Sequence, residues 1–206
     1  LVGGGCIDSL GYDHLWYAKE KERSDPRSVF YAAGACFIMR RDVIDKISVA
    51  GKLFDSDYFI YYEEVDLCWR ALLAGQEIKG IPSAKVHHRP KGHLSEASRG
   101  YIYFQARNRI ATLIKNYDAS NLLIHLPMLV ICELVRSLAL LVTNPAHALV
   151  VLQALVWNLK NLRRTIVKRN IVQHKIRKVR DARVRRMMAR FNLRHLYRVF
   201  RSSYLL

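Results

Sequence analysis

A 21-residue apolar stretch limits what this chain can fold into more than any other feature of its sequence. It covers residues 122–142 and reads LLIHLPMLVICELVRSLALLV, which is long enough to cross a bilayer as a helix. Two full charges, Glu133 and Arg136, lie near its centre and argue against a simple membrane span. A second apolar run, AHALVVLQALVW, is too short to span, and it follows TNP, which can cap and start a helix.

The two apolar runs predict a pair of helices that form a hairpin. We assign residues 119–160 to this hairpin and expect it to lie in, or dip into, the membrane interface. The alternative is an ordinary helical subdomain packed on the rest of the protein.

The positive charge of the chain is concentrated after the hairpin. Residues 160–201 contain 16 Lys and Arg against one acid, Asp181, and so carry +15 of the total formal charge of +17. Val172, Ile176 and Val179 form a narrow apolar stripe among these basic residues. Such helices bind anionic lipid headgroups or nucleic-acid phosphates. We assign residues 161–206 to this basic tail.

An anionic membrane surface is the partner that we expect for the basic tail. The adjacent apolar hairpin favours lipid, and the sequence offers no base-reading motif, so nucleic acid is an unlikely partner. A solvated charged helix without a partner is the alternative.

The part before residue 119 alternates short β-prone runs with helical ones, which is typical of an α/β domain. Residues 29–40, VFYAAGACFIMR, predict a buried strand, and residues 58–62, YFIYY, a second short strand or extended segment. Residues 101–117 predict an amphipathic helix, and Asp42 is expected to cap a short helix. Residues 1–30 are expected to be loop and turn.

The four cysteines are expected to be buried free thiols in a reducing compartment. They are 30, 32 and 64 residues apart, and none belongs to a CxxC pair or to a zinc-like spacing.

Three acids, Glu63, Glu64 and Asp66, stand at the start of a predicted helix that Gly75 ends. The simplest explanation is structural, because the helix macrodipole favours anions at this end and Asp66 can pair with Arg70 one turn on. The alternative is chemical. The acids follow an apolar segment, and a partly desolvated carboxylate has a raised pKa, as a general base requires.

Two further features favour the chemical explanation. VHHRP ends a predicted strand with His87 and His88, and a histidine at such a place can ligate a divalent metal. Gly34 and Ala35 are small residues in a predicted strand, where a ligand can approach the backbone closely.

The succession AAGACF, GKLFD, EEVDLCWR and PSAKVHH resembles the C-terminal half of the catalytic domain of family 2 glycosyltransferases. The likeness is greatest to rhamnosyltransferase-like members that build cell-surface polysaccharides, and it covers residues 29–117. It implies a GT-A-type α/β fold, followed here by an all-helical C-terminal region. Residues 1–118 would then be the acceptor-side part, because the Asp-x-Asp motif of the nucleotide-binding half does not occur in residues 1–28.

The resemblance also implies a reaction. Members of this family transfer a sugar with inversion from a nucleotide-sugar donor, usually with Mg or Mn. A lipid-linked saccharide is the implied acceptor, and the cytoplasmic face of the cell membrane is the implied location. This chain by itself is not expected to bind a nucleotide-sugar tightly.

The family pattern assigns roles to the three acids. Glu64 matches the catalytic base, although the pair here is Glu-Glu where the family has Glu-Asp. Asp66 is the fallback base or an orienting group, and Glu63 would bind the acceptor or support the site.

The remaining assignments concern the donor sugar and the metal. Gly34 and Ala35 would lie beside the donor sugar, and His88 matches the family's metal-ligand position, with His87 as the neighbouring alternative. Two other functions stay open: a non-enzymatic basic protein that binds membranes or nucleic acid, and an inactive homologue in which Glu64 replaced the usual Asp when activity was lost.

Overall fold

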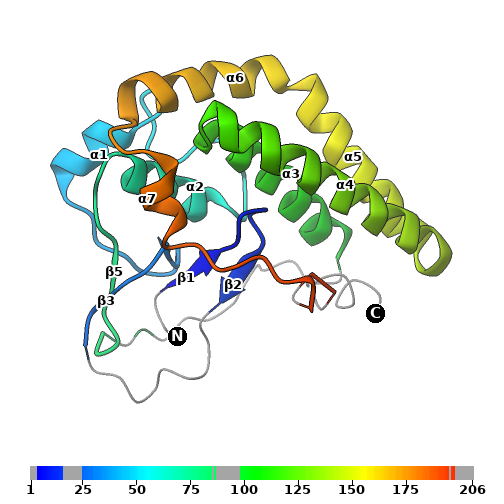
Figure 1. Ribbon diagram of the computed structural model, residues 1–206, viewed down its shortest axis with the longest axis horizontal. Helices are drawn as coiled ribbons and strands as arrows, with labels where there is room; N and C mark the ends of the chain where they lie inside the picture. Colours follow the sequence, from blue (N-terminus) through cyan, green and yellow to red (C-terminus); the bar gives the residue numbers. More distant parts are fainter. Residues whose placement is uncertain (1–3, 16–24, 85, 87–97, 195, 198–206) are drawn as a thin grey trace.

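The computed structural model describes residues 4–15, 25–84, 86, 98–194 and 196–197. This part of the chain is mixed α/β, with two small sheets and a mostly helical remainder. In Figure 1 the long helices lie together on one side of the molecule and the short strands on the other.

The larger sheet has three antiparallel strands in the order β2–β1–β4. Its central strand β1 (Gly4–Ile7) pairs with β2 (Asp13–Leu15) and with β4 (Tyr31–Ala32). The smaller sheet pairs β3 (Arg27–Ser28) with β5 (Lys79–Gly80).

The prediction that residues 1–30 form only loop and turn is wrong, because β1 and β2 lie there. The glycines of β1 are needed for close packing against Tyr31. A Cβ on Gly4 would lie 2.3 Å from the backbone oxygen of Tyr31, and one on Gly5 would lie 2.7 Å from its hydroxyl oxygen. A glycine-rich sequence therefore forms a central strand, since only glycine allows this approach.

The prediction of one buried strand over residues 29–40 is also wrong. Only Tyr31–Ala32 is strand, and the chain then turns, with the Cys36 N–H donating to the Ala33 oxygen at 3.4 Å. Gly34 and Ala35 therefore lie in an exposed turn rather than in a strand.

Two smaller predictions change as well. Helix α1 (Arg41–Ile47) has Arg40 rather than Asp42 at its N-cap, because the Asp42 carboxylate pairs with Arg40 and Lys46 instead. All four cysteines are free, as predicted, but only Cys6 and Cys68 are buried, whereas Cys132 is half-buried and Cys36 is exposed.

Helix α2 (Glu63–Leu73) begins and ends where the sequence predicts. Gly75 takes a φ of +82° just beyond its end. The Gly75 N–H donates to the Leu72 oxygen and the Gln76 N–H to the Ala71 oxygen, both at 3.0 Å. This is a Schellman ending, which explains why glycine stands there.

Three long helices follow, and they confirm the predicted helix over residues 101–117 and the predicted hairpin. They are α3 (Arg99–Asn116), α4 (Ala119–Thr143) and α5 (Pro145–Lys160). Asn144 joins the hairpin helices, and its side chain accepts from the His147 N–H at the start of α5.

The two charges in the middle of α4 point into the protein. Glu133 is fully buried and accepts hydrogen bonds from the Tyr12 hydroxyl at 2.9 Å and from Arg109 at 2.5 Å. Arg136 lies 3.5 Å from the other carboxylate oxygen of Glu133. The charges that argued against a simple span are therefore neutralised by partners inside the molecule.

The basic tail continues as α6 (Leu162–Ile171), a π-helical turn η1 (Val172–Ile176) and α7 (Asp181–Arg185). Its predicted apolar stripe exists, but it faces the protein itself. Val172 and Ile176 are buried in the same core as the strands, and the Val179 N–H donates to the Leu73 oxygen at 3.1 Å. The stripe therefore belongs to the protein core, while the binding of the basic residues to a partner and the division at residues 118 and 160 stay predictions.

Several polar side chains of the tail cap the C-terminal end of α3. Arg169 donates to the Ile114 and Tyr117 oxygens at 2.5 and 2.6 Å. Gln173 donates to the Lys115 oxygen at 2.8 Å, and Arg177 to the Asn116 oxygen at 2.5 Å. The last carbonyls of a helix have no partners within it and attract cations, so part of the positive charge has a structural use.

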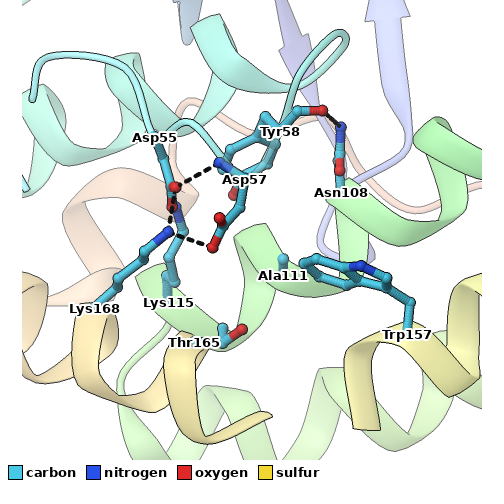
Figure 2. A pocket seen from close by; sticks show the side chains of 9 residues that line it. All are labelled: Asp55, Asp57, Tyr58, Asn108, Ala111, Lys115, Trp157, Thr165 and Lys168. Atoms are coloured by element: carbon cyan, nitrogen blue, oxygen red, sulfur yellow. Dashed lines mark hydrogen bonds and ion pairs between the residues drawn. The ribbon is translucent and has the colours of Figure 1, made fainter. Parts of the chain in front are cut away.

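A buried cluster of charges joins the loop before α2 to α2, α3 and α6 (Figure 2). The Lys115 ammonium is 1% exposed and lies 2.7 Å from an Asp55 oxygen and 3.0 Å from an Asp66 oxygen. Lys168 bonds to both Asp55 and Asp57. A cavity lined in part by Asp55, Asp57, Lys115 and Lys168 holds about 10 Å³, room for roughly one water and no substrate.

We predict that Lys115→Ala lowers the free energy of unfolding by about 3 kcal/mol, because it leaves two buried carboxylates without their shared cation. Urea unfolding monitored by circular dichroism measures this. Lys46→Ala is the matched control, since Lys46 forms an exposed pair with Asp42 at 2.9 Å and should change stability little. Equal losses in the two variants would contradict the role of Lys115.

Candidate active site

Residues 58–62 lead into α2 through a strained backbone. Phe59, Tyr61 and Tyr62 have φ values of 64°, 67° and 68°, the left-handed region that non-glycine residues seldom adopt. Each such residue costs roughly 1–3 kcal/mol and persists only where its surroundings enforce it. The predicted strand or extended segment over these residues is therefore wrong.

The side chain of Asn108 on α3 holds this loop in place. Its amide group donates to the carbonyl oxygens of Tyr58, Ile60 and Tyr61 at 3.0, 2.8 and 2.7 Å. Figure 2 shows the amide pointing at Tyr58. Arg107 adds hydrogen bonds to the Asp57 and Tyr58 oxygens at 2.6 and 2.7 Å. The loop carbonyls are thus satisfied only in the strained conformation.

The loop places Glu63 and Glu64 as the first two residues of α2. Both side chains are half-buried. In each, the Oε2 atom is shielded from solvent and has no hydrogen-bond partner among the described residues. Buried carboxylate oxygens are normally hydrogen-bonded, so two that lack a partner mark this helix start as a candidate functional site.

The pKa of Glu64 is raised to about 7 by its burial, by the neighbouring Glu63 carboxylate and, more weakly, by Asp13. Burial also raises the pKa of Glu63. A carboxylate with a pKa near 7 is a much better base than an ordinary one and is still ionised in a useful fraction of molecules at neutral pH. The arrangement can therefore accept a proton from a hydroxyl group.

Asp13 and Tyr31 are part of the same site, and sequence reasoning did not name either of them. The Tyr31 hydroxyl donates to Asp13 at 2.5 Å, and burial raises the pKa of Asp13 to about 6 although this hydrogen bond opposes the shift. No local motif marks these residues. Only the pairing of β1 with β2 and β4 brings them to the start of α2.

The small residues that the sequence predicts near a donor sugar lie partly at this site. A Cβ on Gly34 would lie 4.0 Å from the Cβ of Glu64, so Gly34 is next to the candidate base. Ala35 is the following residue of the same exposed turn. Their proximity to a sugar stays a prediction.

Asp66 lies in a different environment from Glu63 and Glu64. It is fully buried and accepts from Arg70 at 3.0 Å and from Asn116 at 2.9 Å, and Lys115 lies beside it. Burial disfavours its ionised form, yet Lys115 and Arg70 hold the pKa of Asp66 below its usual value. The predicted pairing with Arg70 is confirmed. These contacts favour the orienting role for Asp66 over that of the fallback base.

His88 and His87 lie outside the described residues, so the predicted metal ligand has no structural description. Among the residues that the structure describes, no three His, Cys, Asp or Glu side chains are grouped so as to hold a metal ion.

We predict that Glu63→Gln lowers the pKa of Glu64 below about 7, because it removes the neighbouring negative charge while burial remains. Carboxyl ¹³C chemical shifts followed through a pH titration measure this midpoint. Glu77→Gln, at an exposed site after α2, should leave it unchanged. An unaltered midpoint in Glu63→Gln would show that the Glu63 charge does not contribute to the raised pKa of Glu64.

Comparison with known proteins gives distant matches to rhamnosyltransferases. The chain is 32% identical over 124 residues to the rhamnosyltransferase WbbL of Escherichia coli, a match that covers 56% of this chain and 45% of that protein. It is also 32% identical over 125 residues to an N-acetylglucosaminyl-diphospho-decaprenol L-rhamnosyltransferase of Mycobacterium tuberculosis, covering 52% of this chain and 39% of that protein.

The chain spans less than half the length of the curated relatives it matches. No protein-family model and no solved structure matches it. Both of these distant relatives are named as rhamnosyltransferases.

Proposed function

We propose that this chain is the acceptor-side part of an inverting glycosyltransferase of the GT-A type. It would act in cell-surface polysaccharide synthesis, with a nucleotide-sugar donor bound mainly by residues outside this chain. The observation that carries the proposal is Glu64, a carboxylate with a pKa of about 7 and an unpaired oxygen at the start of α2. The distant rhamnosyltransferases agree with it.

Glu64 is the proposed base of a single displacement. Its carboxylate takes the proton of an acceptor hydroxyl while that oxygen attacks the anomeric carbon of the donor from the face opposite the nucleotide. A new C–O bond forms, the bond to the diphosphate breaks, and the nucleotide leaves with the electron pair. Glu63 keeps the pKa of Glu64 high, and the network around Asp66 and Asn108 fixes the start of α2.

A divalent metal, Mg or Mn, stays part of the proposal through the family resemblance alone. The described residues do not form a site for it, so no step of the mechanism is assigned to it. His88 is the candidate ligand outside the described residues.

A lipid-linked acceptor and the cytoplasmic face of the membrane are proposed from the apolar surface of the hairpin. Helix α4 is long and apolar enough to cross a bilayer, and only 28% of its most apolar 18-residue segment is buried inside the protein. One face of α4 and α5 exposes large aliphatic side chains: Leu123, Ile124, Ile131, Leu134, Val135, Leu138, Leu141, Val142, Leu149, Val156 and Leu159. We call this the apolar face. A patch of this size marks an interaction surface.

The surroundings of the apolar face suit a lipid surface. The exposed cations Lys160 and Arg163 lie where α5 passes into α6, and they would meet anionic headgroups. A groove of about 530 Å³ between α3 and α5 is lined by Tyr103, Leu149, Leu152, Gln153, Val156, Trp157 and Lys160. It offers a mostly apolar path beside the hairpin, as a lipid-linked saccharide requires.

The alternative of a non-enzymatic basic binder is less well supported, because the tail residues Arg169 and Arg177 bond to the end of α3 instead of facing a partner. The inactive-homologue alternative is decided by the experiment that follows.

We predict that Glu64→Gln in the full-length protein lowers sugar transfer by at least about a hundredfold and leaves donor binding intact, because only the base is lost. Transfer is measured with membranes, Mn and a panel of nucleotide-sugars. The variant should be no less stable than the wild type above pH 7, since it removes a charge that burial disfavours. Turnover that survives the change would remove Glu64 from the mechanism, and a wild type inactive with every donor would favour the inactive homologue.

We predict that the double variant Leu138→Glu with Val142→Glu binds vesicles containing phosphatidylglycerol at least about tenfold more weakly, because it places two charges on the apolar face. Co-sedimentation measures the bound fraction. Ile38→Glu is the matched control, because Ile38 is 99% exposed in the loop before α1. Equal binding by all three proteins would contradict the membrane contact.

A further inference from the structure

The strained loop before α2 exposes an aromatic ring that packing does not explain. Phe59 is 81% exposed and has a φ of 64°. A large apolar side chain held outward on an unfavourable backbone gains little from the protein core. The buried Asn108 amide enforces this conformation through the carbonyls on either side of Phe59. Strain of this kind is concentrated at functional sites, which directs attention to what the ring contacts.

Phe59 belongs to a group of four rings formed by the loop and the first turns of α3. The Phe59 and Phe104 rings lie 5.4 Å apart at an interplanar angle of 34°. The Tyr61 and Tyr101 rings lie 5.0 Å apart at 75°. We call these four residues the aromatic surface. Except for Phe59 its members are half-buried, so the surface is anchored on α3 and open on the side of Phe59.

The aromatic surface adjoins the candidate base along the chain. Tyr61 is followed by Tyr62, the N-cap of α2, and then by Glu63 and Glu64. Phe59 and Tyr61 therefore lie within five residues of both carboxylates along the chain. The aromatic faces carry negative charge density, which attracts the weakly positive C–H groups of a pyranose ring, while tyrosine hydroxyls and carboxylates can bind its hydroxyl groups.

A bilayer is a poorer partner for this surface than a sugar. The apolar face of α4 and α5 is aliphatic, whereas the aromatic surface contains two tyrosines and precedes two carboxylates. Pressing this loop into lipid would desolvate Glu63 and Glu64 further without supplying hydrogen-bond partners.

We propose that the aromatic surface of Phe59, Tyr61, Tyr101 and Phe104 stacks against a pyranose ring of the acceptor saccharide and holds it next to Glu64. The Asn108 amide is a positioning group, which keeps Phe59 outward. This proposal rests on the proposed function, because it identifies the part of the acceptor that the site recognises.

Saturation-transfer NMR on this chain tests the proposal without any turnover. The probes are methyl pyranosides of glucose, galactose, N-acetylglucosamine and rhamnose at millimolar concentration. We expect saturation of the ring C–H protons of at least one of these pyranosides by the wild type. Phe59→Gly should bind it about fivefold more weakly, and Phe59→Trp should bind it as the wild type does. Glycine adopts a φ of 64° without strain, so Phe59→Gly should not lower the unfolding temperature.

Two controls separate this proposal from its alternatives. Phe54→Ala removes another exposed phenyl ring, which packs on Phe37, and should leave saccharide binding unchanged. Binding is measured here without turnover, so a failure of the proposed catalytic role of Glu64 does not affect this test. The proposal is overturned if no pyranoside binds the wild type, if Phe59→Gly binds as the wild type does, or if Phe59→Gly loses vesicle binding and keeps saccharide binding.

Discussion

The buried ammonium of Lys115 is the interaction on which the rest of this structure depends. It lies between Asp55 in the loop before α2 and Asp66 on α2, and Lys168 of α6 reaches the same loop. Buried charges are tolerated only with well-placed partners, so this cluster fixes three helices and one loop relative to each other. Because Asp66 is held two residues beyond Glu64, the cluster also determines where the candidate base lies. Stability and the active-site geometry therefore have a common origin.

The segment Arg107–Asn108–Arg109 shows how α3 connects the site to the hairpin. In sequence it looks like a basic helix face, yet all three residues are buried. Arg107 contacts the loop before α2 and lies 4.6 Å from the centre of the Trp157 ring on α5, while Arg109 pairs with Glu133 on α4. Asn108 holds the strained loop. One helix, α3, therefore contacts both the loop before the candidate active site and the two helices of the hairpin.

Sequence patterns predicted the elements whose signals are local. The 3.6-residue periodicity and the capping residues located α2, α3 and the hairpin, and Gly75 ended α2 as expected, because helix signals act within a few residues. The same local signals gave the acids at the start of α2 a structural explanation, whereas their candidate chemical role came from neighbouring features and the family resemblance. The strands were not predicted correctly from the sequence. Strand β1 is a run of glycines, and its partner strand β4, which contains Tyr31, lies far along the chain.

The sequence by itself determined that the acids begin a helix, that the hairpin is apolar, and that positive charge collects in the tail. Only the tertiary structure separated the three acids. The half-buried Glu63 and Glu64 each keep one oxygen without a partner among the described residues, while the fully buried Asp66 contacts Lys115 and Arg70. The tertiary structure also places basic side chains of the tail against the last carbonyls of α3, and it places Asp13 where its charge acts on Glu64. These outcomes depend on contacts between distant residues, because burial and charge neighbours, which set a pKa, exist only once the chain has folded.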